Sequence, residues 1–251
     1  MNRLENKVAV VTGAAQGIGA AYARGMAIEG ASVVVADVSD TGSVVEEILA
    51  AGGKAIGVNT DVTNDESLAE MVATTEDKLG PIEILINNAA IFASIKLKPF
   101  MQIDNDEWDA VLRVNARGPF QATKAVVPSM RKNGRGKIIN ISSGTFLRGA
   151  PMFCHYVASK GAVVGQTRAL ARELGGDNIL VNCIMVGLTE SEGVASNTQF
   201  DAARGGNLAA RIIQRDMLPE DLLGTIYYLA SEDSDFVSGQ CFNVDGGAIS
   251  A

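Results

Sequence analysis

Three side chains with fixed spacing, Ser143, Tyr156 and Lys160, are the residues of this chain best suited to chemistry. Tyr156 and Lys160 form a Tyr-x-x-x-Lys pattern, which on a helix places both side chains on the same face. A free tyrosine has a pKa of about 10, but a nearby ammonium stabilises the phenolate and lowers that pKa. We therefore expect Tyr156 to exchange a proton with an alcohol oxygen, and Ser143 to hydrogen-bond the same oxygen.

A glycine-rich turn near the start of the chain predicts a dinucleotide site. Residues 7–11 form a short, mostly β-branched run that predicts a buried strand. This strand leads through Thr-Gly-Ala-Ala-Gln-Gly-Ile-Gly, residues 12–19, into a helical stretch. Glycines permit the tight turn and let backbone N–H groups approach a pyrophosphate at the helix N-terminus. For this segment alone, a glycine turn without a ligand is the alternative.

The end of the second predicted strand indicates which dinucleotide binds. Residues 32–36 lead into Asp37, eighteen residues beyond Gly19. A carboxylate at this place accepts hydrogen bonds from the adenosine ribose and repels a 2′-phosphate. The residues around the turn offer no basic side chain that could bind such a phosphate: Ala14, Ala15, Gln16, Val38 and Ser39. The sequence therefore favours NAD over NADP.

Further motifs follow along the chain, and in this combination the chain resembles the short-chain dehydrogenase/reductase family over about residues 7–247. The motifs are the glycine turn, Asp61-Val62, Asn87-Asn88-Ala89-Ala90, Asn115, the spaced Ser143, Tyr156 and Lys160, Ser238-Gly239-Gln240 and Val244-Asp245-Gly246-Gly247. The resemblance implies that Asn115 is the fourth catalytic residue and holds a water in a proton relay. It also implies that Lys160 binds the nicotinamide ribose and that Asp61-Val62 contacts adenine.

The resemblance also implies a set of cofactor contacts. The sequence departs from the family pattern at two of the positions near the cofactor. The expected contacts are Gly13, Gln16, Gly17, Ile18, Gly19, Asp37, Asp61, Val62, Asn88, Ala89, Ala90, Tyr156, Lys160, Gly187, Thr189 and Ser191. Val186 replaces a family proline, which we expect to leave the loop more mobile or to change the width of the pocket. Ala90 replaces a glycine, a mild change if its φ is negative. Whether Thr189 or Ser191 takes the role of the family threonine is left open.

Composition sets limits on the partners. The chain has 251 residues, of which 47% are apolar and 5% aromatic, as expected for a buried parallel sheet. A net charge of −8 argues against nucleic acid as a partner. No apolar run approaches the ~18 residues of a membrane span, and residues 1–6 lack a signal-peptide core, so we expect a cytoplasmic protein. Three cysteines and one histidine predict neither a disulfide framework nor a metal site.

Strands and helices are expected to alternate through the whole chain. Strands are expected near residues 7–12, 32–37, 54–60, 82–87, 136–142, 178–184 and 241–244, and helices near 17–30, 41–52, 64–79, 104–131, 155–175 and 219–231. This order predicts an α/β fold, a single Rossmann-type domain over residues 1–251 with a seven-stranded parallel sheet and helices on both faces. Residues 188–218 break the alternation, with a short helix expected at 207–217. We expect them to form a substrate lid; a surface excursion is the alternative.

The substrate pocket is expected to be mostly apolar. Its expected walls are Phe92, Ser94, Thr145, Phe146, Leu147, Phe153, Val186 and Leu188. Such walls favour an uncharged cyclic, aromatic or terpenoid secondary alcohol, and residues 186–194 are similar to bacterial family members that act on ring alcohols. Three functions stay open: an NAD-dependent alcohol dehydrogenase, an NADPH-dependent carbonyl reductase, and a non-catalytic nucleotide-binding scaffold.

A homotetramer is expected chiefly from the family resemblance. The predicted helix at residues 157–174 adds to this expectation because it has small or apolar residues on more than one face. A sheet can cover only one such face. The largely uncharged tail at residues 241–251 also suits packing against a second copy. The partners expected are therefore an alcohol or ketone and further copies of this chain.

Overall fold

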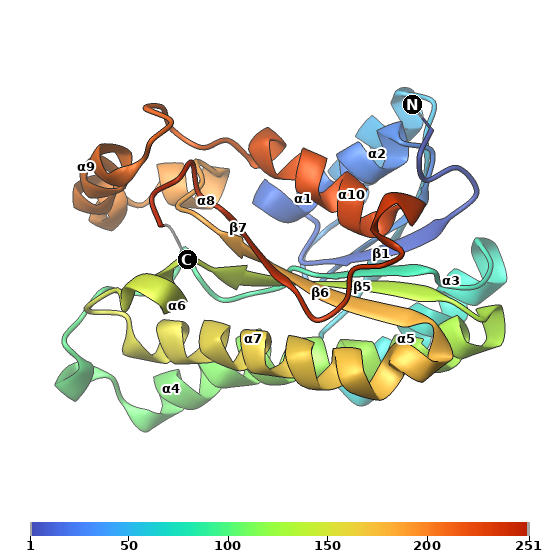
Figure 1. Ribbon diagram of the computed structural model, residues 1–251, viewed down its shortest axis with the longest axis horizontal. Helices are drawn as coiled ribbons and strands as arrows, with labels where there is room; N and C mark the ends of the chain where they lie inside the picture. The colour runs from blue at the N-terminus through green and yellow to red at the C-terminus, as the bar shows by residue number, and fades with distance from the viewer. Residues whose placement is uncertain (1, 250–251) are drawn as a thin grey trace.

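The structure is a computed structural model that describes residues 2–249, apart from the side chains of residues 202 and 203. Its centre is a parallel sheet with the strand order β3-β2-β1-β4-β5-β6-β7 (Figure 1). The strands are β1 (Val8–Thr12), β2 (Ser32–Asp37), β3 (Lys54–Asn59), β4 (Ile84–Asn87), β5 (Gly136–Ser143), β6 (Ile179–Val186) and β7 (Cys241–Val244). The order reverses between β1 and β4, and ligands of open α/β sheets bind at such a switch point.

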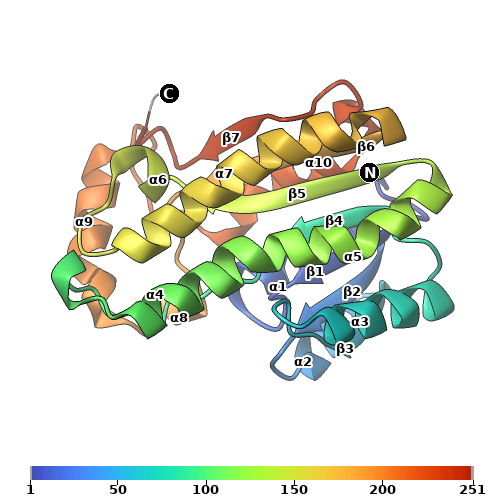
Figure 2. The same cartoon turned by 90° about the horizontal axis from the view of Figure 1, so that it is seen from below.

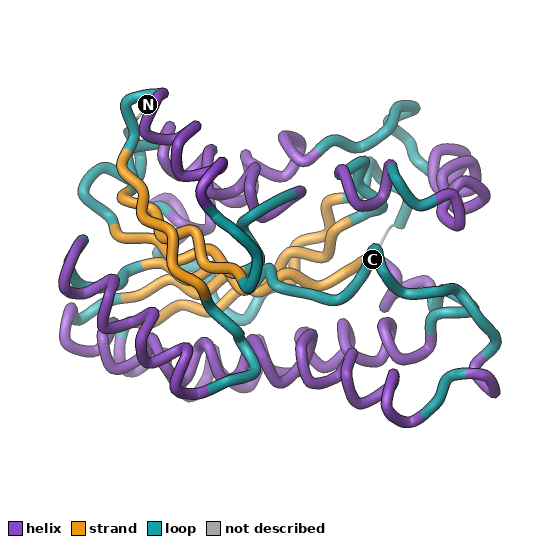
Figure 3. Tube along the Cα trace, turned by 180° about the vertical axis from the view of Figure 1, so that it is seen from behind, coloured by secondary structure: helices purple, strands orange, loops and turns teal. Residues whose placement is uncertain are grey.

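Helices cover both faces of the sheet (Figure 3). One layer has α1 (Gly17–Ile28), α2 (Gly42–Ala50) and α10 (Leu223–Ala230); the other has α3 (Asp65–Lys78), α4 (Asn105–Leu112), α5 (Gly118–Asn133) and α7 (Cys154–Leu174) (Figure 2). Short helices α6 (Thr145–Arg148), α8 (Glu192–Ala195) and α9 (Asp201–Ala210) lie toward one end (Figure 1). The sequence prediction of the fold class is confirmed.

Alternation along the strands divides the core into two layers. In β1, Ala9 and Val11 belong to the cluster beneath α1 and α10, whereas Val10 belongs to the cluster beneath α3 and α5. Successive strand residues point to opposite faces, so a continuous apolar run fills both layers. This packing holds the carboxyl ends of the strands at one edge of the sheet.

Two expected helices differ from the structure. The single helix expected at 104–131 is divided into α4 and α5 by a π-helical segment, Arg113–Arg117. The helix expected at 207–217 begins earlier, as α9, and ends at Ala210. Arg211 leaves the helix with extended backbone because its buried side chain hydrogen-bonds three backbone carbonyls instead. None of the helices in the described part of the chain is long and apolar enough to cross a membrane.

Candidate active site

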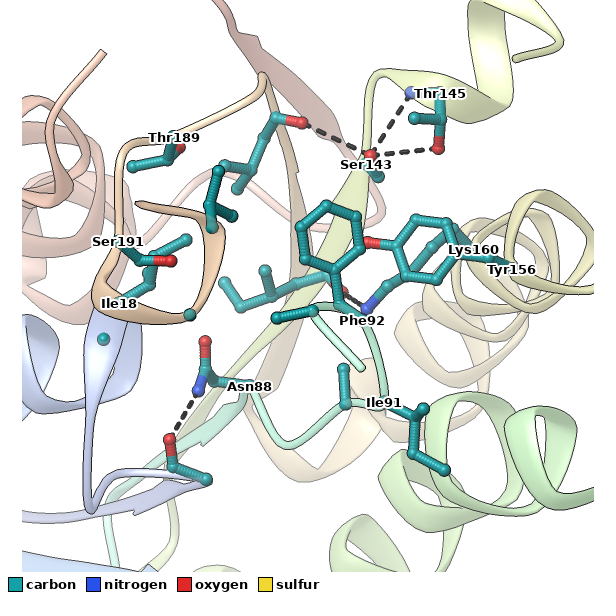
Figure 4. Close-up of a pocket in the computed structure, with 18 of the residues that line it drawn as sticks. Ile18, Asn88, Ile91, Phe92, Ser143, Thr145, Tyr156, Lys160, Thr189 and Ser191 are labelled. Carbon is teal, nitrogen blue, oxygen red and sulfur yellow. Dashed lines mark hydrogen bonds between the residues drawn. The ribbon is translucent and has the colours of Figure 1, made fainter. Parts of the chain in front are cut away.

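A cavity of about 940 Å³, part of which is drawn in Figure 4, lies where the strands β1 to β6 end. Every residue that the sequence predicted to contact the cofactor lines this cavity. Ser143 and, of the expected substrate contacts, Phe92, Thr145, Phe153, Val186 and Leu188 line it as well. The tertiary structure thus brings together segments that are up to about 190 residues apart in the chain.

The glycine turn has a shape that only glycine allows. Gly13 and Gly17 have φ values of +65° and +58°. A Cβ atom on Gly13 would lie 2.6 Å from Cα of Ala89, and one on Gly19 would lie 2.0 Å from the carbonyl oxygen of Gly13. Asn88 fixes the turn, because its Nδ2 donates to the carbonyls of Thr12 and Gly13. The open turn at the start of α1 suits the approach of a pyrophosphate.

Asp37 lies at the end of β2 and lines the same cavity. Its Oδ2 accepts a hydrogen bond from the Ala15 backbone N–H at 3.0 Å, and its Oδ1 accepts one from Ser39 at 2.9 Å. A carboxylate has about four lone-pair sites, so two of them are left for ribose hydroxyls. The turn and this carboxylate together fit a dinucleotide.

The two departures from the family pattern are compatible with the structure. Ala90 is not among the described non-glycine residues with positive φ, so its methyl group adds no backbone strain. Val186 ends β6 in register with Ser143 and Val244, and its carbonyl accepts from the backbone of Gly144. The regular strand pairing therefore continues to the position where the family has proline.

Thr189 and Ser191, the two residues left open by the sequence, both line the cavity. Thr189 donates its hydroxyl to the carbonyl of Gly187 at 3.1 Å. A Cβ atom on Gly17 would lie 3.6 Å from Cβ of Ser191, so Ser191 lies over the glycine turn. Ser191 is thus the hydroxyl placed nearer to the expected pyrophosphate.

Ser143, Tyr156 and Lys160 come together at one wall (Figure 4). Ser143 ends β5, and the other two lie one turn apart near the start of α7. The Nζ of Lys160 lies 5.7 Å from the centroid of the Tyr156 ring and donates to the carbonyl of Ile141 at 2.9 Å. Thr145 donates its hydroxyl to Oγ of Ser143 at 3.0 Å, which fixes the serine in place.

The pKa values of this group are set mainly by burial. Burial raises the pKa of Tyr156 above its usual value, and the hydrogen bond with Ser143 opposes this effect. Burial also lowers the pKa of Lys160 to about 8, partly offset by the nearby Cys183. The sequence predicted a lowered tyrosine pKa, and this prediction is wrong for the structure. The cause is burial, because loss of solvent disfavours the charged phenolate.

Asn115 lies behind the cavity wall rather than on it. The side chain is fully buried in the π-helical segment. Its Oδ1 accepts from the Ile91 N–H at 2.7 Å, and its Nδ2 donates to the Ile91 carbonyl at 3.0 Å and to Ser159 at 3.2 Å. Asn115 therefore holds the strand-to-loop segment that carries Ile91 and Phe92 into the cavity.

An aromatic cluster surrounds Tyr156. The Phe153 ring stacks on the Tyr156 ring at 4.6 Å between centroids, and the Phe92 ring lies 5.0 Å from it. Phe200 stacks on Phe92 at 5.1 Å from the other side. The reacting end of the cavity is therefore flat-sided and apolar, apart from the hydroxyl groups of Ser143, Thr145 and Tyr156.

Three residues expected to bind substrate do not line the cavity. Ser94, Phe146 and Leu147 are exposed. A Cβ atom on Gly161 would lie 3.0 Å from the Phe146 ring, so this ring covers α7 from outside. The sequence could not show this, because α6 is a single turn whose orientation depends on its packing against α7.

Several residues of the cavity wall were missed by the sequence predictions. They are Thr60, Ile91, Ala93, Leu97, Val114, Ile141, Ser142, Arg148, Ala150, Pro151, Met152, Gly193, Val194, Phe200, Gly206 and Asn207. Half of them come from α6, from the loop after it and from α8 and α9. For the wall residues in α8 and α9, the only signal in the sequence was the expectation of a lid over residues 188–218.

His155 has a structural environment. It is fully buried, does not line the cavity, and its Nε2 lies 3.3 Å from a carboxylate oxygen of Glu107. Within residues 2–249, no cluster of three or more His, Cys, Asp or Glu side chains could hold a metal ion.

Comparisons with known proteins define the class. Residues 13–248 match the profile of the family described as Enoyl-(Acyl carrier protein) reductase. The chain is 37% identical to 3-oxoacyl-[acyl-carrier-protein] reductase of Thermotoga maritima, with 98% of this chain and 99% of that protein covered. It is 35% identical to cyclopentanol dehydrogenase of a Comamonas species, with 98% of each covered.

A solved structure agrees with this assignment. A protein from Beutenbergia cavernae, assigned as an NAD(P)-dependent gluconate 5-dehydrogenase and containing NADP at low occupancy, superposes with a TM-score of 0.91. The two chains are 33% identical, and 98% of each is covered. The chain belongs to the short-chain dehydrogenase/reductase family, whose members are oxidoreductases that bind a nicotinamide cofactor. The named relatives act on different substrates, so the family alone does not identify the substrate.

Proposed function

We propose that this protein is an NAD-dependent oxidoreductase that interconverts a cyclic or aromatic secondary alcohol and its ketone. The observation that carries the proposal is the placement of Ser143, Tyr156 and Lys160 in the same cavity as Asp37 and the glycine turn. The aromatic rings around Tyr156 support a ring-shaped substrate. Cyclopentanol dehydrogenase, one of the relatives, is named for a ring alcohol.

The side chains suggest how the proton is moved. Ser143, oriented by Thr145, donates a hydrogen bond to the substrate oxygen, and Tyr156 takes the hydroxyl proton on its phenolate oxygen. Lys160 stabilises that phenolate and, through the same charge, offers hydrogen bonds to a ribose. When bound, NAD supplies a positively charged ring that accepts a hydride from the carbinol carbon. A positive charge in this cavity lowers the pKa of Tyr156, against the effect of burial.

Asp37 supports NAD as the preferred cofactor. Its carboxylate is fixed by two backbone N–H groups at the wall of the cavity, where a 2′-phosphate would bring a second negative charge. The NADP in the Beutenbergia cavernae structure favours the second candidate, an NADPH-dependent carbonyl reductase. A non-catalytic scaffold would have no need for the buried Ser143, Tyr156 and Lys160.

The test is a screen of ring alcohols with NAD and then NADP, read as absorbance of the reduced nicotinamide. The variant Tyr156→Phe should bind NAD with the wild-type affinity in calorimetry and lose turnover by about 10²–10⁴-fold, because it removes the proton carrier alone. A variant that kept more than about a tenth of the wild-type kcat would contradict the role of Tyr156.

Residues 188–218 are proposed to act as a substrate lid.

The protein is also proposed to be a homotetramer. Ala158, Gly165 and Ala169 on α7 are exposed in the single chain, which supports cover by another copy. The last two residues of the tail, 250 and 251, lie outside the described residues. Light scattering coupled to gel filtration tests the assembly, and a mass near 26.2 kDa would contradict it. The cytoplasmic location inferred from the sequence stays a prediction.

A further inference from the structure

One charged side chain on the cavity wall has no part in the proposed chemistry. Four charged residues line the cavity among those described: Asp37, Asp61, Arg148 and Lys160. Asp37 ends β2 and Asp61 follows β3, at the end of the sheet that the dinucleotide is expected to occupy. Lys160 is buried beside Tyr156. Arg148 is the charge left for the substrate, and it is exposed at the rim.

Arg148 lies one helical turn from Thr145, the residue that is hydrogen-bonded to Ser143. Arg148 ends α6, three residues after Thr145, so both side chains lie on one face of this turn. The Thr145 hydroxyl donates to the Ser143 hydroxyl at 3.0 Å. One helical turn spans about 5 Å along the axis. A substrate whose oxygen lies at Ser143 therefore reaches Arg148 with its other end.

Arg148 has no carboxylate partner among the described residues. Its Nη2 donates to the neutral Oδ1 of Asn207 at 2.6 Å, which joins α6 to α9. By contrast, Arg204 and Arg215, in the same part of the molecule, are paired with Glu190 and Asp221. A guanidinium has five N–H donors, and a carboxylate can accept two of them side by side. Arg148 is thus held in place by an amide, with its charge uncompensated.

The part of the cavity wall next to Tyr156 is apolar. Phe92, Phe153 and Phe200 form the aromatic cluster around Tyr156, and Leu97 and Val194 pack with it. An apolar ring loses no hydrogen bonds to water when it enters between these side chains. A polyol chain would leave its hydroxyl groups without partners there. The cavity therefore has a hydroxyl-binding end, an apolar middle and a cationic rim.

Building on the proposed function, we propose that Arg148 binds a substrate carboxylate, so that the substrate class is an aromatic or alicyclic hydroxy acid. The carbinol carbon and the carboxylate are on opposite sides of the ring. This differs from the uncharged alcohol expected from the sequence, because Arg148 was not recognised there as part of the wall. Asn207 acts as the positioning residue that keeps the guanidinium over the cavity.

The test compares two ketones of nearly equal shape, 4-acetylbenzoate and 4-acetylbenzamide, by calorimetry on the enzyme saturated with oxidised NAD. Oxidised NAD cannot reduce a ketone, so only binding is measured. Wild-type enzyme should bind the acid at least about tenfold more tightly than the amide, which corresponds to about 1.4 kcal/mol. Raising NaCl from about 0.05 to 0.5 M should weaken binding of the acid alone.

Variants of Arg148 show whether the preference comes from this side chain. Arg148→Met should remove the preference and leave amide binding unchanged, and Arg148→Lys should keep part of it, because an ammonium lacks the bidentate geometry. Arg131→Met at the exposed end of α5, away from the cavity, is the matched control and should behave as wild type. If Arg148→Met weakened acid and amide equally, Arg148 would only fasten α9, and the proposal would be wrong.

Equal affinity of the wild type for acid and amide, or no binding of the acid, would also overturn the proposal. Turnover is measured separately with 4-(1-hydroxyethyl)benzoate and NAD. Selective binding of the acid without any oxidation of this alcohol would contradict the proposed function and leave the assignment of Arg148 standing. Oxidation of this alcohol without selective binding of the acid would support the proposed function and overturn the assignment of Arg148.

Discussion

Replacing Arg211 by methionine should loosen the proposed lid without unfolding the sheet. Arg211 is 5% exposed and donates from Nε to the Asp245 carbonyl at 3.3 Å, from Nη1 to the Arg215 carbonyl at 2.9 Å and from Nη2 to the Leu188 carbonyl at 2.5 Å. These bonds join the two ends of the segment 188–218 to the loop after β7. Methionine keeps an apolar stem of similar length and removes all three bonds.

The expected magnitude follows from the carbonyls that lose their donor. Arg215 is exposed, so water can replace the bond to its carbonyl. The carbonyls of Leu188 and Asp245 are less accessible, and each unsatisfied buried group costs about 1–3 kcal/mol. Relief of the buried charge offsets part of this cost. We therefore expect a local loss of about 2–4 kcal/mol, which raises the local opening equilibrium about 30- to 700-fold.

Hydrogen exchange followed by mass spectrometry measures this effect. Protection should fall by that factor at backbone N–H groups of the segment, such as Glu190, which donates to the Met217 carbonyl, and Ile212, which donates to the Gly246 carbonyl. Amides of the central strands should keep their protection, and substrate KM should rise more than kcat falls. Arg131→Met is again the control. Protection within twofold of wild type at residues 188–218, or a loss spread over the sheet, would refute the reasoning.

Two further predictions concern single carboxylates. Asp37→Ala should reduce the ratio of kcat/KM for NAD over NADP at least about tenfold, because it removes the charge that repels a 2′-phosphate; an unchanged ratio in steady-state kinetics would show that another group discriminates. The hydrogen bond with Arg215 lowers the pKa of Asp221 to about 2, so its stabilisation is present above the usual carboxyl pKa and is lost as pH falls toward 2. Urea midpoints of wild type and Asp221→Asn should therefore differ most at pH 6, and the difference should shrink progressively as pH falls toward 2; a difference independent of pH would contradict this.

The sequence was sufficient for the features that depend on local pattern. The β-branched runs and the glycine turn predicted β1, α1 and the cofactor end of the cavity, because turn chemistry and hydrophobic periodicity act over a few residues. The four-residue spacing of Tyr156 and Lys160 fixed their common face once α7 formed. Strand boundaries agree with the structure to within about two residues because buried parallel strands have clear ends.

Only the tertiary structure decided which side chains meet at the substrate end. Arg148 and Asn207 are 59 residues apart, and their contact depends on how α6 and α9 pack, which no local pattern encodes. The same holds for Phe146, which faces outward, and for Asn115, which supports the wall from behind. The raised pKa of Tyr156 is also a tertiary effect, because it results from the exclusion of water by residues distant in sequence. Local periodicity therefore determined the scaffold and the cofactor end, whereas long-range packing determined the chemistry of the pocket.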